Sequence, residues 1–131
     1  MDATFLQKVT SDFPDIRFMS GRKFSFRPPN TVVIGPSEIH DSLLLLHEIG
    51  HFLVGKYDYT TEVGRLRIEV AAWEEAKKLA DRYGVDHDED VVQGELDSYR
   101  DWLHPKSRCP KCGLTRFQTP DGVFHCPKCD F

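Results

Sequence analysis

Two histidines four residues apart, with a glutamate between them, carry the clearest chemical signal in the sequence. His47, Glu48 and His51 form the pattern H-E-x-x-H. On a helix, residues four apart lie on the same face, one turn above each other. The two imidazoles can therefore bind one divalent ion such as Zn²⁺, and Glu48 can act as the general base on the water that this ion binds.

The residues around this motif favour a buried helix over a surface helix with two solvated histidines. Leu43 to Leu46 precede the motif, and Phe52 to Val54 follow it. Burying two histidines and a carboxylate is costly unless they have a partner, so a buried motif indicates a bound metal. Gly50 leaves room beside the face that would hold the metal.

A catalytic zinc needs a third protein ligand and an open fourth position. The position six residues past His51 is Tyr57, so the third histidine of the metzincin pattern is absent. The next helix offers Glu69, which we expect on the core-facing side together with Val70 and Trp73. A carboxylate on that side favours a cation, so Glu69 is the predicted third ligand.

The alternative for Glu69 is a carboxylate at the edge of the core, bonded to Arg65 or to a ligand histidine. The other acids of this helix are less suited to a metal. Glu62 stands at its expected exposed start, and Glu74 and Glu75 precede Lys77 and Lys78, a pattern typical of a solvated face.

All four cysteines lie in two C-x-x-C pairs near the end of the chain, at Cys109, Cys112, Cys126 and Cys129. Each pair can place two thiolates on one metal, and Pro120-Asp121-Gly122 between the pairs predicts a hairpin turn. This arrangement resembles a zinc ribbon. We expect a closed, structural Cys₄ zinc site, because disulfides are improbable in a cytosolic chain.

The segment 105–131 is also chemically distinct, with five basic and two acidic residues, whereas residues 1–104 carry a net charge of −7. Its aromatic residues include Phe117 and Phe124. A basic surface with aromatic rings suits single-stranded nucleic acid. The alternatives are a tail that docks on a protein or that only stabilises the fold.

The elements that must position these groups follow from periodicity and turn residues. We expect a helix over 2–11, short strands over 15–19, 23–27 and 31–34, and helices over 41–54 and 62–83, with a last helix ended by Pro105. Asp41 or Ser42 would cap the second helix and Gly55 would end it. The sequence thus predicts an α+β fold, with a short N-terminal antiparallel sheet and the H-E-x-x-H helix in a core domain over 1–104, followed by the ribbon over 105–131.

Composition sets the broad class. The chain has 131 residues, 40% hydrophobic and 29% charged, which is an ordinary globular balance. No apolar run approaches the roughly 20 residues of a membrane span, and the N-terminus lacks the pattern of a signal peptide. We therefore expect a cytoplasmic protein that does not enter membranes.

Two histidines from one helix and a glutamate from the next resemble the gluzincins. The small size and the strand-rich N-terminal third are similar to the minigluzincins and the related ImmA/IrrE-type metallopeptidases. The residues that match are His47, Glu48, His51 and Glu69, within roughly residues 15–104. The resemblance implies a zinc-dependent, zincin-like peptidase in which Thr31 to Ile34 form the sheet edge that pairs with an extended substrate.

The chain departs from these families at two positions beside the predicted ligand. Trp73 stands where the larger gluzincins carry an acid that orients a histidine, and Ala71 stands where the ImmA/IrrE-like helix often has a second acid. Support for the metal ligands must therefore come from elsewhere. An H-E-x-x-H core followed by a four-cysteine ribbon is also similar in architecture to the SprT/Spartan proteases, whose third ligand is a histidine.

The sequence predicts a zinc metallopeptidase with one catalytic and one structural Zn²⁺, acting on a protein or peptide substrate. The competing hypothesis is a zincin-fold regulatory protein with poor turnover, whose ribbon binds nucleic acid or a protein partner. The oligomeric state and the group that stabilises the oxyanion stay open. Candidates for that group are Tyr57, Tyr59, His87 and Tyr99.

Overall fold

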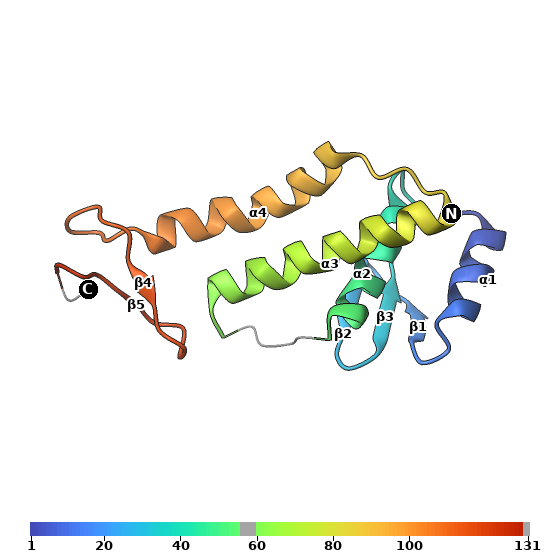
Figure 1. Cartoon of the computed structure of the whole chain (residues 1–131), viewed down its shortest axis with the longest axis horizontal. Helices are drawn as coiled ribbons and strands as arrows, with labels where there is room; N and C mark the ends of the chain where they lie inside the picture. The colour runs from blue at the N-terminus through green and yellow to red at the C-terminus, as the bar shows by residue number, and fades with distance from the viewer. Residues whose placement is uncertain (56–59, 130–131) are drawn as a thin grey trace. The chain divides into compact units, whose positions relative to one another are not determined.

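The computed structural model describes residues 1–55 and 60–129, with only the backbone for 102–106. The chain forms two compact units (Figure 1). The first comprises Met1–Lys56 and Ala71–Asp88, and the second comprises Tyr57–Val70 and Glu89–Phe131. Both sides of the predicted boundary at 104 and 105 belong to the second unit, so that boundary stays a prediction.

The first unit contains a three-stranded sheet in the order β1-β3-β2, formed by Arg17–Ser20, Ser25–Arg27 and Thr31–Ile34. Strand β3 occupies the centre because Val32 and Val33, which point to opposite faces, are both buried. Strand β2 pairs with β3 antiparallel, whereas β1 pairs with β3 parallel.

This topology corrects two predictions. The sheet is mixed and not antiparallel throughout, because β3 returns beside β2 and then pairs with β1 on its other side. For the same reason Thr31–Ile34 is not a sheet edge. Both of its sides already hold strand partners, so any added strand would have to pair with β1 or β2.

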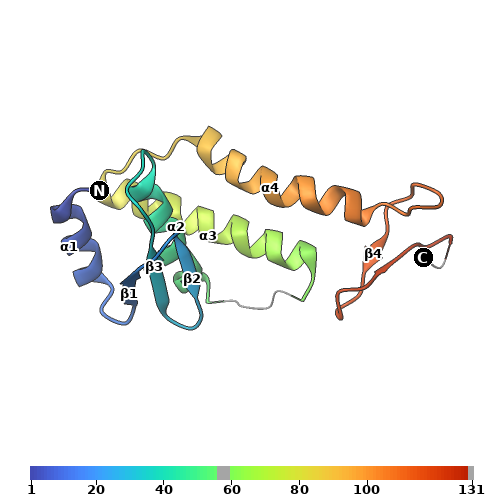
Figure 2. The same cartoon turned by 180° about the vertical axis from the view of Figure 1, so that it is seen from behind.

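Helix α1, Ala3–Asp12, lies beside β1 in both views (Figures 1 and 2). Helix α2, Asp41–Val54, packs on β2 and β3. Nearly all of α2 up to His51 is buried, so it is the central helix of this unit. It ends at Gly55, whose φ of 67° is the left-handed conformation that suits a glycine at a helix end, as predicted.

Helix α3, Glu62–Tyr83, begins in the second unit and ends in the first. Its limits match the prediction, and Gly84 follows its last residue with a φ of 69°. The expected core-facing side was partly wrong, because Val70 is 38% exposed while Glu69 is buried. Val70 lies about 100° around the helix from Glu69, outside the arc that the buried positions occupy. The buried positions of the helix are Ile68, Glu69, Ala72, Trp73, Ala76, Leu79 and Ala80.

The second unit also contains helix α4, Glu89–Ser107, and a hairpin of β4, Phe117–Gln118, and β5, Phe124–His125. Helix α4 continues two residues past Pro105, where the sequence predicted its end. A proline in the last turn forfeits one backbone hydrogen bond but does not prevent the turn. Within the described residues, no helix combines the length and apolar character needed to cross a membrane.

Candidate metal sites

Helix α2 places the H-E-x-x-H motif in the interior of the first unit. His47, Glu48 and His51 are 9%, 8% and 6% exposed. One nitrogen of each histidine and one carboxylate oxygen of Glu48 lie within 4.8 Å of one another. Three ligating groups gathered in a buried position form a potential metal-binding site, because their desolvation is costly unless a cation compensates for it.

Each of the two histidines lies nearly parallel to an aromatic ring of another element. The Trp73 ring of α3 stacks on His47, with centroids 4.1 Å apart and planes 5° apart. The Phe26 ring of β2 stacks on His51, with centroids 5.9 Å apart and planes 9° apart. Aromatic pairs of this kind contribute about 0.5–1.5 kcal/mol beyond the area they bury. Both stacks restrict rotation of the imidazoles, so they help to fix the orientation of the nitrogens.

The close approach of α2 and α3 depends on Gly50. A Cβ atom at this position would lie 2.3 Å from the backbone oxygen of Ala72. Ala72 and Trp73 are adjacent, so this contact also sets how closely the indole approaches His47. Gly50 lies between Glu48 and His51, and its role is therefore helix packing on the side of the motif that faces α3.

A buried carboxylate anchors the beginning of α2. Asp41 accepts hydrogen bonds from the amino group of Met1 at 3.0 Å and from the backbone N–H of Glu38 at 3.4 Å. Burial acts against its ionisation, but these hydrogen bonds, one from the Ser42 backbone and the charge of the amino group together lower the pKa of Asp41. The predicted cap at Asp41 or Ser42 was wrong, since the helix cap is His40, without a side-chain hydrogen bond. Asp41 instead holds the preceding loop to the first turn.

Glu48 lies directly beside the first histidine. Its Oε1 atom is 3.4 Å from Nδ1 of His47. This position is compatible with two roles, as a base that acts on a water molecule or as a further ligand of the metal. The two roles differ in one measurable respect, because an amide at this position would keep the metal in the first case and weaken its binding in the second.

Glu69, the predicted third ligand, is buried on α3, with 7% of its surface exposed. It belongs to the second unit, whereas the two histidines belong to the first. Its coordination of a metal stays a prediction, supported by its burial. The predicted solvated face is confirmed for Glu74, which is exposed and pairs with Lys77 at 3.3 Å. Glu75 pairs with Lys78 at 3.2 Å but is half-buried, and so is Glu62, which was expected at an exposed helix start.

The four candidates for stabilising an oxyanion lie in different parts of the structure or outside the described residues. Tyr57 and Tyr59 lie outside the described residues. His87 forms a contact of 2.8 Å between its Nε2 atom and Oδ1 of Asp81, on the surface of the first unit. Tyr99 is half-buried on α4 in the second unit. The pairing of His87 makes it a less suitable donor than the sequence suggested.

The four cysteines form a second potential metal-binding site, as predicted. Their sulfur atoms lie within 4.8 Å of one another, and Sγ of Cys112 is 3.6 Å from Sγ of Cys126. A tetrahedral zinc with Zn–S bonds of about 2.3 Å places two sulfurs about 3.8 Å apart, whereas a disulfide requires about 2.0 Å. The cysteines are free thiols in the structure. The geometry therefore fits one metal held by four sulfurs.

Backbone N–H groups donate hydrogen bonds to the cysteine sulfurs, which favours their thiolate form. The N–H groups of Lys128 and Cys129 each donate to Sγ of Cys126 at 3.3 Å. Burial acts against ionisation of Cys109, but backbone hydrogen bonds from Cys112 and Lys111 outweigh it and lower its pKa to about 6. Burial and the neighbouring thiols raise the pKa of Cys129 to about 12. Four thiolates so close together therefore need a cation to stay ionised together.

The hairpin that carries the second cysteine pair has one exposed aromatic face. Phe117 and His125 are directly paired across the strands and stack with centroids 5.6 Å apart. The Phe117 side chain is 55% exposed, and Val123 and Leu114 are 48% and 46% exposed. On the other face, Gln118 accepts a hydrogen bond from the Glu62 backbone.

Sequence reasoning found the two metal-ligating clusters but not the aromatic rings that support the histidines. Trp73 stands where the larger gluzincins carry an acid, and Phe26 lies within the strand predicted over 23–27, but neither ring was predicted to stack on a histidine. The spacing of Trp73, one helical turn after Glu69, placed it near the site, but no local pattern indicates stacking.

Comparisons with known proteins add no assignment. No protein-family model matches the sequence, and neither the curated proteins nor the solved structures include a match.

Proposed function

We propose that the protein is a zinc-dependent metallopeptidase that hydrolyses peptide bonds in protein substrates. The observation that carries this proposal is the buried group of His47, Glu48 and His51, whose ligating atoms lie within 4.8 Å of one another. Zinc is the metal that suits two imidazoles and a carboxylate in a site with an open position. The resemblance of the sequence to the gluzincins supports the same reaction class.

The chain's own residues supply binding and proton transfer. A zinc ion held by the two histidines would polarise the scissile carbonyl and acidify the attacking water. His47 and His51 bind through imidazole nitrogens whose orientation the rings of Trp73 and Phe26 restrict. Glu48 accepts the proton of the attacking water on its carboxylate and passes it to the leaving amine.

Glu69 is proposed as the third ligand of this catalytic zinc. A buried carboxylate needs a compensating cation or hydrogen bonds, and Glu69 is only 7% exposed. Glu75, on the same helix, is a half-buried acid in an ion pair with Lys78 and serves as the matched control. Glu69→Ala should lower the zinc content of the first site, and Glu75→Ala should leave it unchanged.

The four cysteines are proposed to hold a structural zinc, in the manner of a zinc ribbon. A Cys₄ site has no open position for a substrate, so its contribution is to fold the segment around the hairpin. Four thiols kept as metal ligands suit a reducing compartment, which favours the cytoplasm.

The exposed hairpin face favours a second candidate function, a zincin-fold regulatory protein whose ribbon binds a partner. Phe117 stacks on His125 and remains 55% exposed, an arrangement suited to stacking against an unpaired base. Residues 105–131 carry five basic and two acidic side chains, so a nucleic acid is the favoured partner over a protein. In this case the first metal site would turn over slowly or not at all.

One variant separates the two candidates. Wild type and Glu48→Gln, both zinc-loaded, should be compared for cleavage of fluorescently labelled casein and of a DNA-bound protein, with zinc content measured in parallel. The proposal expects cleavage by wild type alone and equal zinc content in both proteins. Equal behaviour of the two proteins on all substrates would exclude the peptidase. Loss of zinc in the variant would identify Glu48 as a ligand and overturn its role as base.

A further inference from the structure

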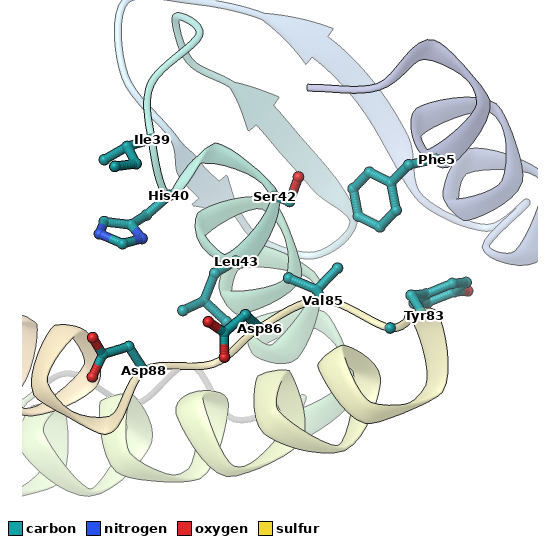
Figure 3. A pocket seen from close by; sticks show the side chains of 10 residues that line it. Phe5, Ile39, His40, Ser42, Leu43, Tyr83, Val85, Asp86 and Asp88 are labelled. Atoms are coloured by element: carbon teal, nitrogen blue, oxygen red, sulfur yellow. The ribbon is translucent and has the colours of Figure 1, made fainter.

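A cavity of about 550 Å³ opens in the first unit, between the N-terminal ends of α1 and α2 and the C-terminal end of α3 (Figure 3). Ordinary ligand pockets fall in the same range, roughly 300–1,000 Å³. None of the residues assigned above to a metal lines it. The lining residues are Phe5, Ile39, His40, Ser42, Leu43, Tyr83, Gly84, Val85, Asp86 and Asp88.

One side of this cavity is an ordered apolar wall. Phe5 and Tyr83 meet edge to face, with centroids 6.0 Å apart and planes at 87°. The Tyr83 hydroxyl donates to Asp12 at 2.6 Å, which fixes the ring. Leu43, 1% exposed, lies between this wall and the polar side of the cavity (Figure 3). The wall can therefore receive an apolar side chain without rearranging.

The other side of the cavity is acidic. Asp86 and Asp88 both line it, and among the described lining residues there is no lysine or arginine. The last turn of α3 adds the partial negative charge of a helix C-terminus, since Tyr83 is its final residue. Lys8 and Arg82 approach the Tyr83 ring at 5.7 and 5.3 Å and offset part of this potential. The lining nevertheless favours a cation over an anion.

The rim extends the apolar surface beyond the cavity. Ile39 is 90% exposed, the highest exposure of any large apolar side chain among the described residues. A free small amine would occupy part of the cavity without covering Ile39. A peptide segment would cover it, because the residues beside the inserted side chain run across the rim.

We propose that this cavity binds an extended peptide segment of a protein partner, with an apolar side chain inserted against Phe5 and Tyr83. The adjacent Lys or Arg of the segment lies against Asp86 and Asp88, and the backbone of the segment crosses Ile39. The site goes beyond the proposed peptidase function and does not depend on it.

The test is fluorescence polarisation with three labelled hexapeptides and the full-length, zinc-loaded protein. The peptides are Ser-Gly-Leu-Lys-Gly-Ser, the same sequence with Glu in place of Lys, and the same sequence with Ser in place of Leu. We expect the Leu-Lys peptide to bind about fivefold more tightly than either of the others, since charge and apolar contact each contribute about 1 kcal/mol. Mass spectrometry of the recovered peptide shows that binding, and not cleavage, is measured.

Three variants with substitutions at exposed residues test the location of the site without disturbing the core. The double variant Asp86→Lys, Asp88→Lys should weaken the Leu-Lys peptide about tenfold, and Ile39→Ser about threefold. Asp15→Lys, an exposed acid that does not line the cavity, should change binding by less than about twofold. Equal binding of all three peptides, or no effect of the double variant, would overturn the proposal. Binding of isopentylamine as tight as that of the peptide would show a small-amine site and overturn it as well.

Discussion

Replacing Gly50 by alanine tests the helix contact on which the first metal site depends. A Cβ atom at this position would lie 2.3 Å from the backbone oxygen of Ala72. Because the obstacle is backbone, no side chain can rotate away and the two helices must separate. Overpacking of this kind costs about 1–3 kcal/mol and occasionally more. A backbone obstacle places the cost at the upper end of this range, and alanine gains about 1 kcal/mol of helix propensity over glycine, so the net expected loss is about 2 kcal/mol.

Gly94 supplies the matched control for this substitution. It lies inside α4, and a Cβ atom there would meet nothing within 4 Å. Gly94→Ala should therefore stabilise the protein by up to about 1 kcal/mol, through propensity alone. The two identical substitutions are expected to act with opposite signs.

Urea unfolding of the zinc-loaded proteins, followed by far-UV circular dichroism, measures both effects. The separation of α2 and α3 in Gly50→Ala should also move Trp73 away from His47, so weaker zinc binding at the first site is expected together with the loss of stability. A Gly50→Ala protein as stable as wild type would refute the close helix contact. A destabilised Gly94→Ala protein would show that helix propensity does not dominate at that exposed position.

Three further predictions follow from the same structure. Trp73→Leu should weaken zinc binding at the first site about tenfold, measured by competition with a fluorescent chelator, whereas Trp73→Phe should retain most of the wild-type zinc affinity. Equal zinc affinities of Trp73→Leu and wild type would exclude a positioning role for the indole. The folded pKa of Asp41 is lowered, so its carboxylate stabilises the fold at neutral pH and loses this effect as the pH falls through that value. The loss of stability in Asp41→Asn, about 1–3 kcal/mol at pH 7, should therefore shrink below about pH 4 in urea unfolding, and a constant difference would contradict the assignment. Cys112→Ser removes a thiolate ligand, and acidification from pH 7 to 5 makes protons compete for the thiolates, so each should release zinc from the ribbon. Either change should also remove the protection of β4 and β5 amides in hydrogen exchange. Retained protection would contradict a metal-dependent hairpin.

Local sequence signals predicted the elements that carry the chemistry. The limits of α2 and α3 follow from apolar periodicity and from Gly55 and Gly84, whose positive φ angles end the helices. The four cysteines were predicted to converge because a hairpin turn joins two short-range pairs, and short-range geometry is readable from spacing.

Features that depend on contacts between distant segments were not predictable in this way. The parallel pairing of β1 with β3 depends on β3 being the strand that is buried on both faces. Val32 and Val33 are buried only when the elements on both faces of the sheet are in place. The stacks of Trp73 on His47 and of Phe26 on His51 join elements far apart in the sequence. The geometry of the stack of Trp73 on His47 depends on the close helix approach that Gly50 permits, which no periodicity encodes.

The most direct test of the central claim is the zinc content of the purified protein, measured by inductively coupled plasma mass spectrometry after removal of loosely bound metal. The account predicts two zinc ions per wild-type chain, one in the double variant His47→Ala, His51→Ala, and one in the double variant Cys109→Ser, Cys112→Ser. A wild-type chain that holds one zinc, and keeps it when both histidines are replaced, would contradict a metal site on α2.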